Sequence, residues 1–316
     1  MTILVTGSAG HLGEALMRTF REQGTEAIGI DLLASPFTDV VGSIADRAVV
    51  EQAMREVTAV LHAATLHKPH VASHPRQAFV DVNITGTLNL LEAATAHRVQ
   101  RFIYTSTTST FGDALTPPAG SPAAWVTEEV RPVPKNIYGV TKVAAEDLCQ
   151  LAWRNQGLPC LILRTSRFFP EGDDVPEKAA AFNGDNLKVN ELLYRRVDIE
   201  DVVGAHLCAL DKAESLGFGR FIITATTPFE PGDAGELGRD APAVLARRVP
   251  EYSSIYSERG WKMLPALDRV YVNQRARELL GWRPRYDFRR ALRAVAGGAD
   301  WRSPLASEVG SKGYHR

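Results

Sequence analysis

The fold is decided by the stretch Thr6-Gly7-Ser8-Ala9-Gly10-His11-Leu12-Gly13, which follows directly on the apolar run of residues 1–5. A buried strand that ends in a glycine-rich turn and enters a helix is the layout of a dinucleotide-binding site. Gly7 permits the tight turn, Gly10 lets the backbone approach a pyrophosphate, and Gly13 lets the helix pack closely on its strand. The turn therefore predicts a phosphate site at a helix N-terminus.

A carboxylate follows at the position where such a site reads the nucleotide ribose. Asp31 ends the second apolar run, residues 27–30. At that strand end it can accept hydrogen bonds from both ribose hydroxyls of adenosine, whereas the 2′-phosphate of NADP would meet a like charge. The sequence therefore favours NAD over NADP as the cofactor.

The composition favours small-molecule chemistry. The chain has 316 residues, is 45% hydrophobic, and carries a formal net charge of -1 without a Lys/Arg block. Nucleic acids and membrane surfaces demand a basic face, so neither is an expected partner. The three cysteines, Cys149, Cys160 and Cys208, lack metal-site spacing, and there is no secretory leader pattern and no apolar stretch of about 20 residues. We expect a cytoplasmic protein without a membrane span.

Short β-branched runs alternate with helical patterns up to about residue 165. This rhythm predicts an α/β fold with a doubly wound parallel sheet and helices on both faces. The expected strands are residues 2–6, 27–31, 59–63, 101–105 and 159–164, and the expected helices include residues 83–97 and 138–153.

The rhythm breaks after Arg164, which suggests a smaller second lobe. We expect residues 1–165 to form the nucleotide-binding domain, with residues 195–226 returning to its core as strands 195–199 and 220–225 around a helix, 201–213. Residues 166–194 and 227–296 are assigned to a substrate-binding lobe with Pro and Gly punctuation. The weakly patterned residues 297–316 are expected to form a flexible tail.

A second motif, Tyr138-Gly139-Val140-Thr141-Lys142, supplies groups for proton transfer. A spacing of four on a helix places the phenol and the ammonium on one face. A neighbouring Lys⁺ favours the phenolate, so the pKa of Tyr138 is expected to fall toward neutrality, as a general acid/base requires.

Hydroxyl side chains end the strand that precedes this motif. Residues 105–110 are all Thr or Ser, followed by Phe111 and Gly112. The C-terminal edge of a parallel sheet faces the ligand crevice, so a hydroxyl there can orient a carbonyl.

With these motifs together, residues 1–295 resemble the extended short-chain dehydrogenases/reductases, the NAD-dependent epimerase/dehydratase group, whose fold is a Rossmann-type sheet with a smaller C-terminal lobe. The resemblance implies Thr107, Tyr138 and Lys142 as catalytic residues, with Lys142 also holding the nicotinamide ribose. It implies a cofactor site formed by Gly7, Gly10, His11, Leu12, Gly13, Asp31, Ser43, Ile44, Ala63, Ala64, Asn83, Tyr138 and Lys142.

Departures from the family pattern concern the substrate. The segment that meets adenine usually carries Asp but reads Gly42-Ser43-Ile44, and the diphosphate-contacting Asn of sugar-nucleotide epimerases is missing after Arg164. Dehydration is disfavoured, because Thr107 is followed by Thr108 and Ser109 rather than by Asp-Glu. The run of residues 164–171 is similar to that of uronate dehydrogenases, which oxidise free sugar acids.

The candidate substrate residues are Thr107, Thr108, His67, Ser166, Arg167 and Arg196. A guanidinium binds phosphate or carboxylate bidentately, so Arg167, Arg195 and Arg196 are candidates for an anion site, with Arg167 best placed. Surface pairing with Glu200 or Asp201 is the alternative role of these arginines. Pro69 and Pro75 break the helix that would align His67, His70 and His74, and no Asp, Glu or Cys is spaced with them, so we expect no metal there.

These observations predict an NAD-dependent enzyme that moves a hydride at a carbinol carbon of a sugar or sugar nucleotide, with Tyr138 as acid/base. If the hydride returns to the other face the enzyme is an epimerase, and if NADH leaves it is a uronate or other sugar dehydrogenase. A non-catalytic NAD sensor is the third alternative. A homodimer is a further expectation.

Overall fold

The computed structural model describes residues 1–118, 120–172, 181–182 and 184–313. Its centre is a seven-stranded sheet in the order β3-β2-β1-β4-β5-β7-β8, and every pairing in it is parallel. The strands are β1 (Ile3–Thr6), β2 (Ala27–Asp31), β3 (Val40–Val41), β4 (Ala59–His62), β5 (Arg101–Thr107), β7 (Cys160–Thr165) and β8 (Phe218–Ile223). The predicted doubly wound parallel sheet is therefore confirmed.

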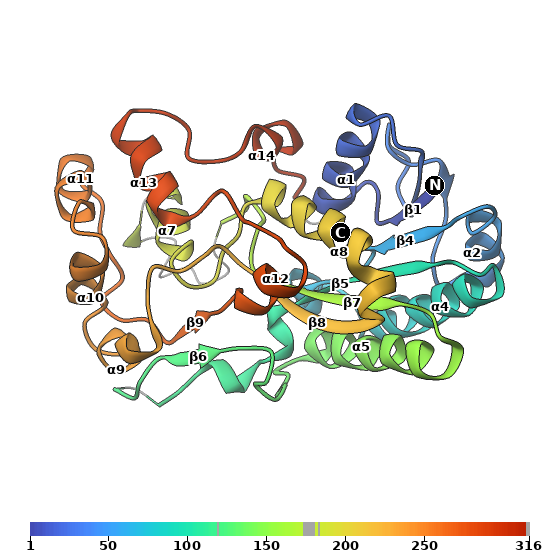
Figure 1. The fold of residues 1–316 in the computed structure, drawn as a ribbon, viewed down its shortest axis with the longest axis horizontal. Helices are drawn as coiled ribbons and strands as arrows, with labels where there is room; N and C mark the ends of the chain where they lie inside the picture. The colour runs from blue at the N-terminus through green and yellow to red at the C-terminus, as the bar shows by residue number, and fades with distance from the viewer. Residues whose placement is uncertain (119, 173–180, 183, 314–316) are drawn as a thin grey trace.

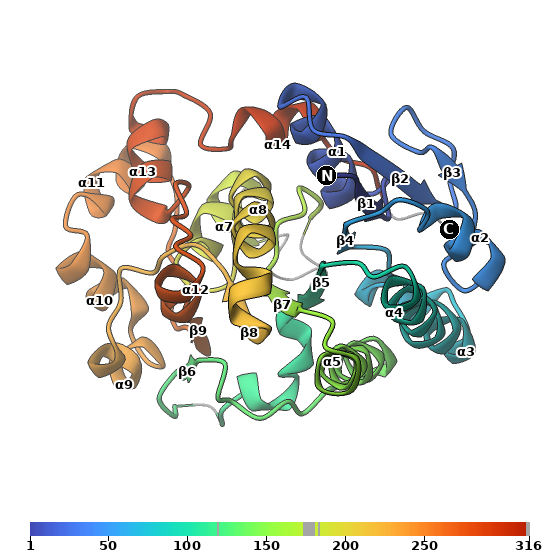
Figure 2. The ribbon, with the colours of Figure 1, turned by 45° about the vertical axis from the view of Figure 1, so that its right-hand side comes forward.

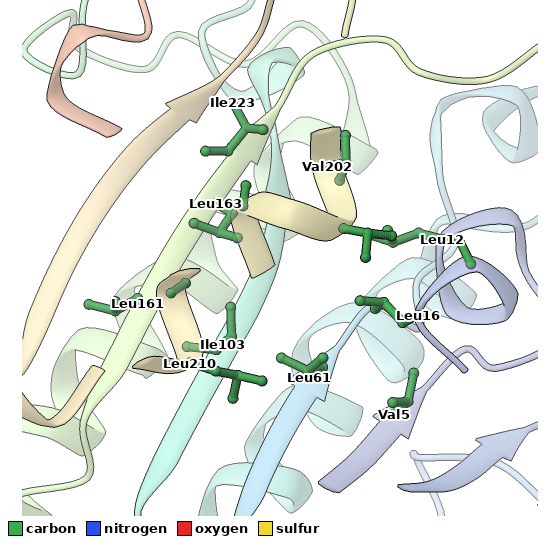
Figure 3. Packing of buried hydrophobic residues seen from close by; sticks show 14 of the residues in the cluster. Val5, Leu12, Leu16, Leu61, Ile103, Leu161, Leu163, Val202, Leu210 and Ile223 are labelled. Carbon is green, nitrogen blue, oxygen red and sulfur yellow. The ribbon is translucent and has the colours of Figure 1, made fainter. Parts of the chain in front are cut away.

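Helices cover both faces of this sheet (Figure 1). On one face, α1 (His11–Glu22) and α8 (Ile199–Leu216) pack on alternate strand residues such as Val5, Leu61 and Ile103 (Figure 3). On the other face, α4 (Gly86–Ala96) and α5 (Ile137–Gln156) pack on the intervening residues, including Val60 and Phe102, and α2 (Arg47–Ala53) extends this layer. Because side chains alternate along a strand, a strand buried on both faces reads as a continuous apolar run.

A second hydrophobic core lies beyond the carboxyl ends of the strands, in the lobe that also holds a two-stranded parallel sheet (Figures 1 and 2). That core draws on Ala123, on residues 187–194 and on residues between 225 and 301, so three separate segments build one lobe. Its elements are β6 (Ala124–Val126), α7 (Gly184–Glu191), α9 (Ala234–Leu237), α10 (Ala241–Arg248), α11 (Tyr252–Arg259), β9 (Arg269–Tyr271) and α13 (Phe288–Ala296).

The remaining elements connect the two cores. They are α12 (Gln274–Leu279), α14 (Pro304–Val309), α3 (Arg76–Phe79), a π-helix at Val80–Thr85, and 3₁₀ turns at Lys68–Ala72, Thr108–Thr110, Asp113–Leu115 and Pro231–Asp233. Among the described residues, no helix combines the length and apolar character that a membrane crossing requires.

The expected strand at residues 195–199 is wrong. The structure has one isolated bridge there, between Arg167 and Arg196. Asp198 caps the next helix, because its carboxylate accepts a hydrogen bond from the Glu200 N–H at 2.8 Å. The cap turns the chain into α8 at Ile199, which leaves too few residues for a strand.

The expectation of a flexible tail after residue 296 is also wrong as far as residue 313. Helix α14 packs between α1 and α8, and Val309 is buried in the same core as Leu12. The Ser303 N–H donates to Asp198 Oδ2 at 3.0 Å, and Ser303 itself is fully buried. The buried contacts of Val309 and Ser303 thus hold this segment in place, although its helical pattern in the sequence is weak.

Candidate functional site

The glycine turn between β1 and α1 is as compact as its sequence predicts. Gly7 adopts a φ of +74°, and a Cβ on it would lie 2.8 Å from the Ala64 backbone nitrogen. A Cβ on Gly13 would lie 1.9 Å from the Gly7 carbonyl oxygen. Neither position tolerates a side chain, so α1 begins at His11 directly over the end of β1.

Asp31 is fixed at the end of β2 by the same turn. Its Oδ2 accepts a hydrogen bond from the Ala9 N–H at 3.0 Å, and its Oδ1 accepts one from the Leu33 N–H at 2.9 Å. The carboxylate thus faces the space above the glycine turn, where an adenosine ribose would lie.

A cleft of about 720 Å³ opens along the carboxyl edge of the sheet. This volume falls within the range of cofactor and ligand pockets. Its lining includes most of the residues that the sequence predicted for cofactor and substrate: Gly7, Gly10, His11, Leu12, Gly13, Asp31, Ser43, Ile44, Ala63, Ala64, His67, Thr107, Thr108, Tyr138, Ser166 and Arg167. The glycine turn, Asp31 and the cleft together fit a bound dinucleotide.

Asn83 is a scaffold residue in this structure rather than part of the cleft lining. Its Oδ1 accepts hydrogen bonds from the Leu66 N–H and the Thr65 hydroxyl, both at 2.9 Å. Its Nδ2 donates to the Leu66 carbonyl and to Thr141 Oγ1, both at 3.0 Å. Asn83 therefore ties the loop after β4, which lines the cleft, to helix α5.

Thr107 and Tyr138 meet in the cleft from different elements. Thr107 is the last residue of β5, and Tyr138 lies in the first turn of α5, whose cap is Asn136 accepting from the Gly139 N–H at 3.0 Å. Both side chains are largely buried, with 9% and 7% exposure. A strand end and a helix start thus converge on one point of the cleft.

The predicted fall of the Tyr138 pKa does not hold for this structure. Burial raises the pKa of Tyr138 to about 12, against a smaller lowering by its hydrogen bond with Thr107. Burial also lowers the pKa of Lys142 to about 7, although the neighbouring Glu146 raises it. The sequence pattern placed the charge beside the phenol but did not show how deeply both groups are buried.

Lys142 lies behind the cleft surface. Its Nζ donates to the Thr105 carbonyl at 2.7 Å and sits 4.1 Å from the centre of the Tyr104 ring. One turn further along α5, the buried Glu146 accepts from Ser106 Oγ at 2.6 Å and from Arg164 Nη2 at 2.7 Å. This network fixes α5 against β5 and β7 and gives Lys142 a rigid setting.

Aromatic rings form one wall of the cleft. Phe169 contacts His11 and His67 with ring centres 5.2 and 5.4 Å apart, and His67 lies 4.6 Å from His70. Burial, with the positive potential of nearby His70 and His11, lowers the pKa of His67 to about 3, so this imidazole is neutral at physiological pH. The described residues contain no group of three or more His, Cys, Asp or Glu side chains arranged to hold a metal ion.

The cleft lining is rich in positive charge. Among the described lining residues, Asp31 is the only carboxylate, against the cations Lys68, Lys135, Arg167, Arg195, Arg269 and Lys312. Several are also paired with carboxylates, as in the 2.6 Å contact of Arg195 Nη2 with the buried Glu191. Such a lining attracts anionic ligands.

Arg196 does not line the cleft, contrary to its predicted substrate role. It is buried with 3% exposure, and its Nε donates to Glu191 at 2.7 Å while its Nη1 donates to the Phe169 carbonyl at 2.9 Å. Arg195 also pairs with Glu191, through its Nη2 at 2.6 Å, but unlike Arg196 it belongs to the cleft lining.

Sequence reasoning missed the contributions of Arg269, Tyr271 and Lys312 to the lining. The first two belong to β9, which pairs with β6 across more than a hundred residues of chain. A pairing between strands so far apart in the chain leaves no motif and no periodic pattern in the sequence. Lys312 lies in the segment that the weak sequence pattern predicted to be flexible.

Comparisons with known proteins agree with this geometry. A family model described as the NAD dependent epimerase/dehydratase family matches residues 3–223. The uncharacterized protein y4nG of Sinorhizobium fredii is 34% identical over 172 residues, which are 52% of this chain and 40% of that protein. UDP-glucose 4-epimerase of Rhizobium meliloti is 27% identical over 325 residues, which cover 90% of this chain and 93% of the relative.

The fold is similar to that of a short-chain dehydrogenase/reductase superfamily protein from Agrobacterium tumefaciens, solved with bound NAD. The two chains superpose with a TM-score of 0.67 at 26% sequence identity, over 98% of this chain and 99% of that chain.

Proposed function

Since the chain belongs to the NAD-dependent epimerase/dehydratase family, we propose that it moves a hydride between NAD and a carbinol carbon of a sugar or sugar nucleotide. The observation that carries this proposal is the meeting of Thr107 and Tyr138 in one cleft with the glycine turn and Asp31. A hydroxyl, a phenol and a dinucleotide site within one cleft are the parts that alcohol oxidation needs.

Bound NAD supplies the hydride acceptor and a positively charged nicotinamide ring. Tyr138 exchanges a proton with the substrate oxygen, and the Thr107 hydroxyl orients that oxygen. Lys142 would hold the ribose hydroxyls beside the nicotinamide. An ammonium has three N–H donors, and the Thr105 carbonyl occupies one, so the others are available for this contact.

The two directions of the reaction need different protonation states of Tyr138. With a pKa of about 12, the phenol of the free protein is protonated at neutral pH and can act as the acid that reduces a carbonyl. Oxidation needs the phenolate, and the positive charge that oxidised NAD and a protonated Lys142 would supply would favour that form.

The positive lining supports a substrate with an anionic group. Arg167, Arg195 and Arg269 line the same cleft, and a guanidinium can recognise a diphosphate or a carboxylate. The Rhizobium meliloti relative is named for a UDP-sugar substrate, which favours a sugar nucleotide. Residues 164–171 are similar to a segment of uronate dehydrogenases, and Arg167 and Phe169 of this segment line the cleft. A free sugar acid is therefore the second candidate substrate.

Turnover with the two substrate classes tests the proposal. The protein with NAD is incubated with UDP-hexoses and, separately, with free uronic acids, while NADH absorbance and the product NMR spectrum are recorded. We expect one class to react, as epimerisation without net NADH or as oxidation with one NADH per product. Tight NAD binding with no turnover in either class would favour the sensor and contradict the proposal.

A further inference from the structure

The segment after α14 crosses the cleft at its nucleotide end. Helix α14 is held to the core by Val309, and the chain then turns at Gly310, which has a φ of +61°. The next residues run over the glycine turn, and Lys312 and Gly313 belong to the cleft lining together with Gly10 and His11. A segment far along the chain thus closes onto the site formed by its first helix.

One carboxylate holds this segment in place. Glu171 Oε1 accepts hydrogen bonds from Ser311 Oγ at 2.9 Å, from the Gly313 N–H at 3.2 Å and from the Lys312 N–H at 3.3 Å. His11 Nε2 lies 3.0 Å from the same oxygen. The Lys312 nitrogen is also 3.2 Å from His11 Nε2, but that atom cannot donate to Glu171 and accept from Lys312 at once, so we assign both donors to the carboxylate.

Glu171 retains its charge under this arrangement. Burial by itself would raise the pKa of Glu171, but the hydrogen bond and charge of His11, together with the Ser311 hydroxyl, outweigh burial and lower it to about 2. A charged acceptor makes stronger hydrogen bonds than a neutral one. The contact therefore joins three parts of the chain: the glycine turn, the loop after β7 and the C-terminal segment.

The Lys312 side chain reaches the first turn of α1. Its Nζ donates to Glu14 Oε2, and the other oxygen of Glu14 accepts from Arg18 Nε at 2.8 Å. The Lys312 side chain has 19% exposure. It therefore sits beside the helix N-terminus that faces the phosphates of a bound dinucleotide.

We propose that Ser311, Lys312 and Gly313 form a latch over the pyrophosphate of bound NAD, in which Lys312 adds positive charge at the phosphates and Glu171 holds the backbone of the latch. The inference rests on NAD binding alone and is independent of the reaction and of the sugar. NAD leaves only when the segment lifts, so the latch sets how long the cofactor stays bound.

Binding measurements on purified variants test the latch. We compare the full chain with a chain ending at Gly310, with Lys312→Ala and Lys312→Arg, and with Lys212→Ala, which removes an exposed lysine of α8 outside the cleft. The NAD dissociation constant is measured by calorimetry and the NADH release rate by stopped-flow fluorescence. Thermal unfolding shows whether each variant is folded.

We expect the chain ending at Gly310 to release NADH about tenfold faster, the order that one charge-assisted hydrogen bond contributes. Lys312→Ala raises the NADH release rate by a smaller factor. This factor falls as the salt concentration rises, because salt screens the attraction between Lys312 and the phosphates. Lys312→Arg and Lys212→Ala stay near the full chain. Release rates within twofold for both the shortened chain and Lys312→Ala, or tighter NAD binding by either, would overturn the latch.

Discussion

At the scale of single residues, Lys142 is the position where function and stability oppose each other. Its ammonium is buried with 2% exposure, and its pKa falls from 10.5 to about 7 because burial disfavours the charge. Between pH 7 and 10.5 the unfolded chain binds more protons at this residue than the folded chain does. The free energy of unfolding therefore rises with pH across that window. Below pH 7 the ammonium is charged in both states, and its burial lowers the free energy of unfolding by the full amount.

We expect Lys142→Met to raise the melting temperature at pH 6 by an amount on the order of several degrees, while activity is lost. The gain should shrink between pH 7 and 10, because the lysine itself becomes neutral in the folded protein. Calorimetric melting of both proteins across this range measures the difference, with Lys212→Met as the exposed control. A gain that stays constant with pH, or a lower melting temperature at pH 6, would contradict the burial cost.

The sequence predicts those residues of the site that belong to motifs with a short, fixed spacing. The glycine turn and the four-residue spacing of Tyr138 and Lys142 are local patterns with a direct geometric meaning, whereas Thr107 was implied by the resemblance to the family. The pKa direction of Tyr138 was not predictable. It depends on burial, which comes from α5, β5 and the Thr107 contact together, and no short stretch encodes that.

At the scale of elements, the loop after β7 connects the sheet to the substrate side. The Arg167 N–H donates to the Arg195 carbonyl at 3.1 Å, and the Val197 N–H donates to the Arg167 carbonyl at 3.0 Å. Arg167 Nη2 also donates to the Glu171 carbonyl at 3.4 Å. The loop is thus held to the segment before α8, and its guanidinium lies at the cleft.

We expect Arg167→Ala to raise the KM of an anionic substrate about tenfold or more, because a guanidinium offers two parallel hydrogen bonds to phosphate or carboxylate. The affinity for NAD should change little. Steady-state kinetics and NAD calorimetry separate the two effects, with Arg167→Lys as the charge-retaining variant and the exposed Arg131→Ala as control. An unchanged KM for every active substrate would point to a neutral sugar.

The central strands and α5 were predictable because each is a strong local pattern. Residues 195–199 and the tail were not. Val197 and Ile199 alternate with polar residues as in a strand, but Asp198 between them caps α8 and ends the extended segment. Helix α14 has only six residues, Pro304–Val309, and owes its place to packing on α1 and α8. Short elements depend on tertiary contacts, which a single sequence does not reveal.

At the scale of the whole molecule, the two hydrophobic cores lie on the two sides of the cleft. The sheet core carries the glycine turn, Asp31 and Thr107, and the lobe core carries β9 with Arg269.

The homodimer stays a prediction. Exposed Leu88 on α4 and Val140 and Leu151 on α5 are apolar side chains on neighbouring helices that a second copy of the chain would cover.

The proposed hydride transfer depends on proton exchange at Tyr138, so the turnover of Tyr138→Phe tests it directly. This change removes only the phenolic oxygen from a buried ring, so the fold and the NAD dissociation constant should stay near those of the full protein. We expect kcat on the reacting sugar substrate to fall by about 100-fold or more, the usual effect of a lost general acid/base. A Tyr138→Phe protein that keeps full turnover with the same NAD affinity would contradict the account.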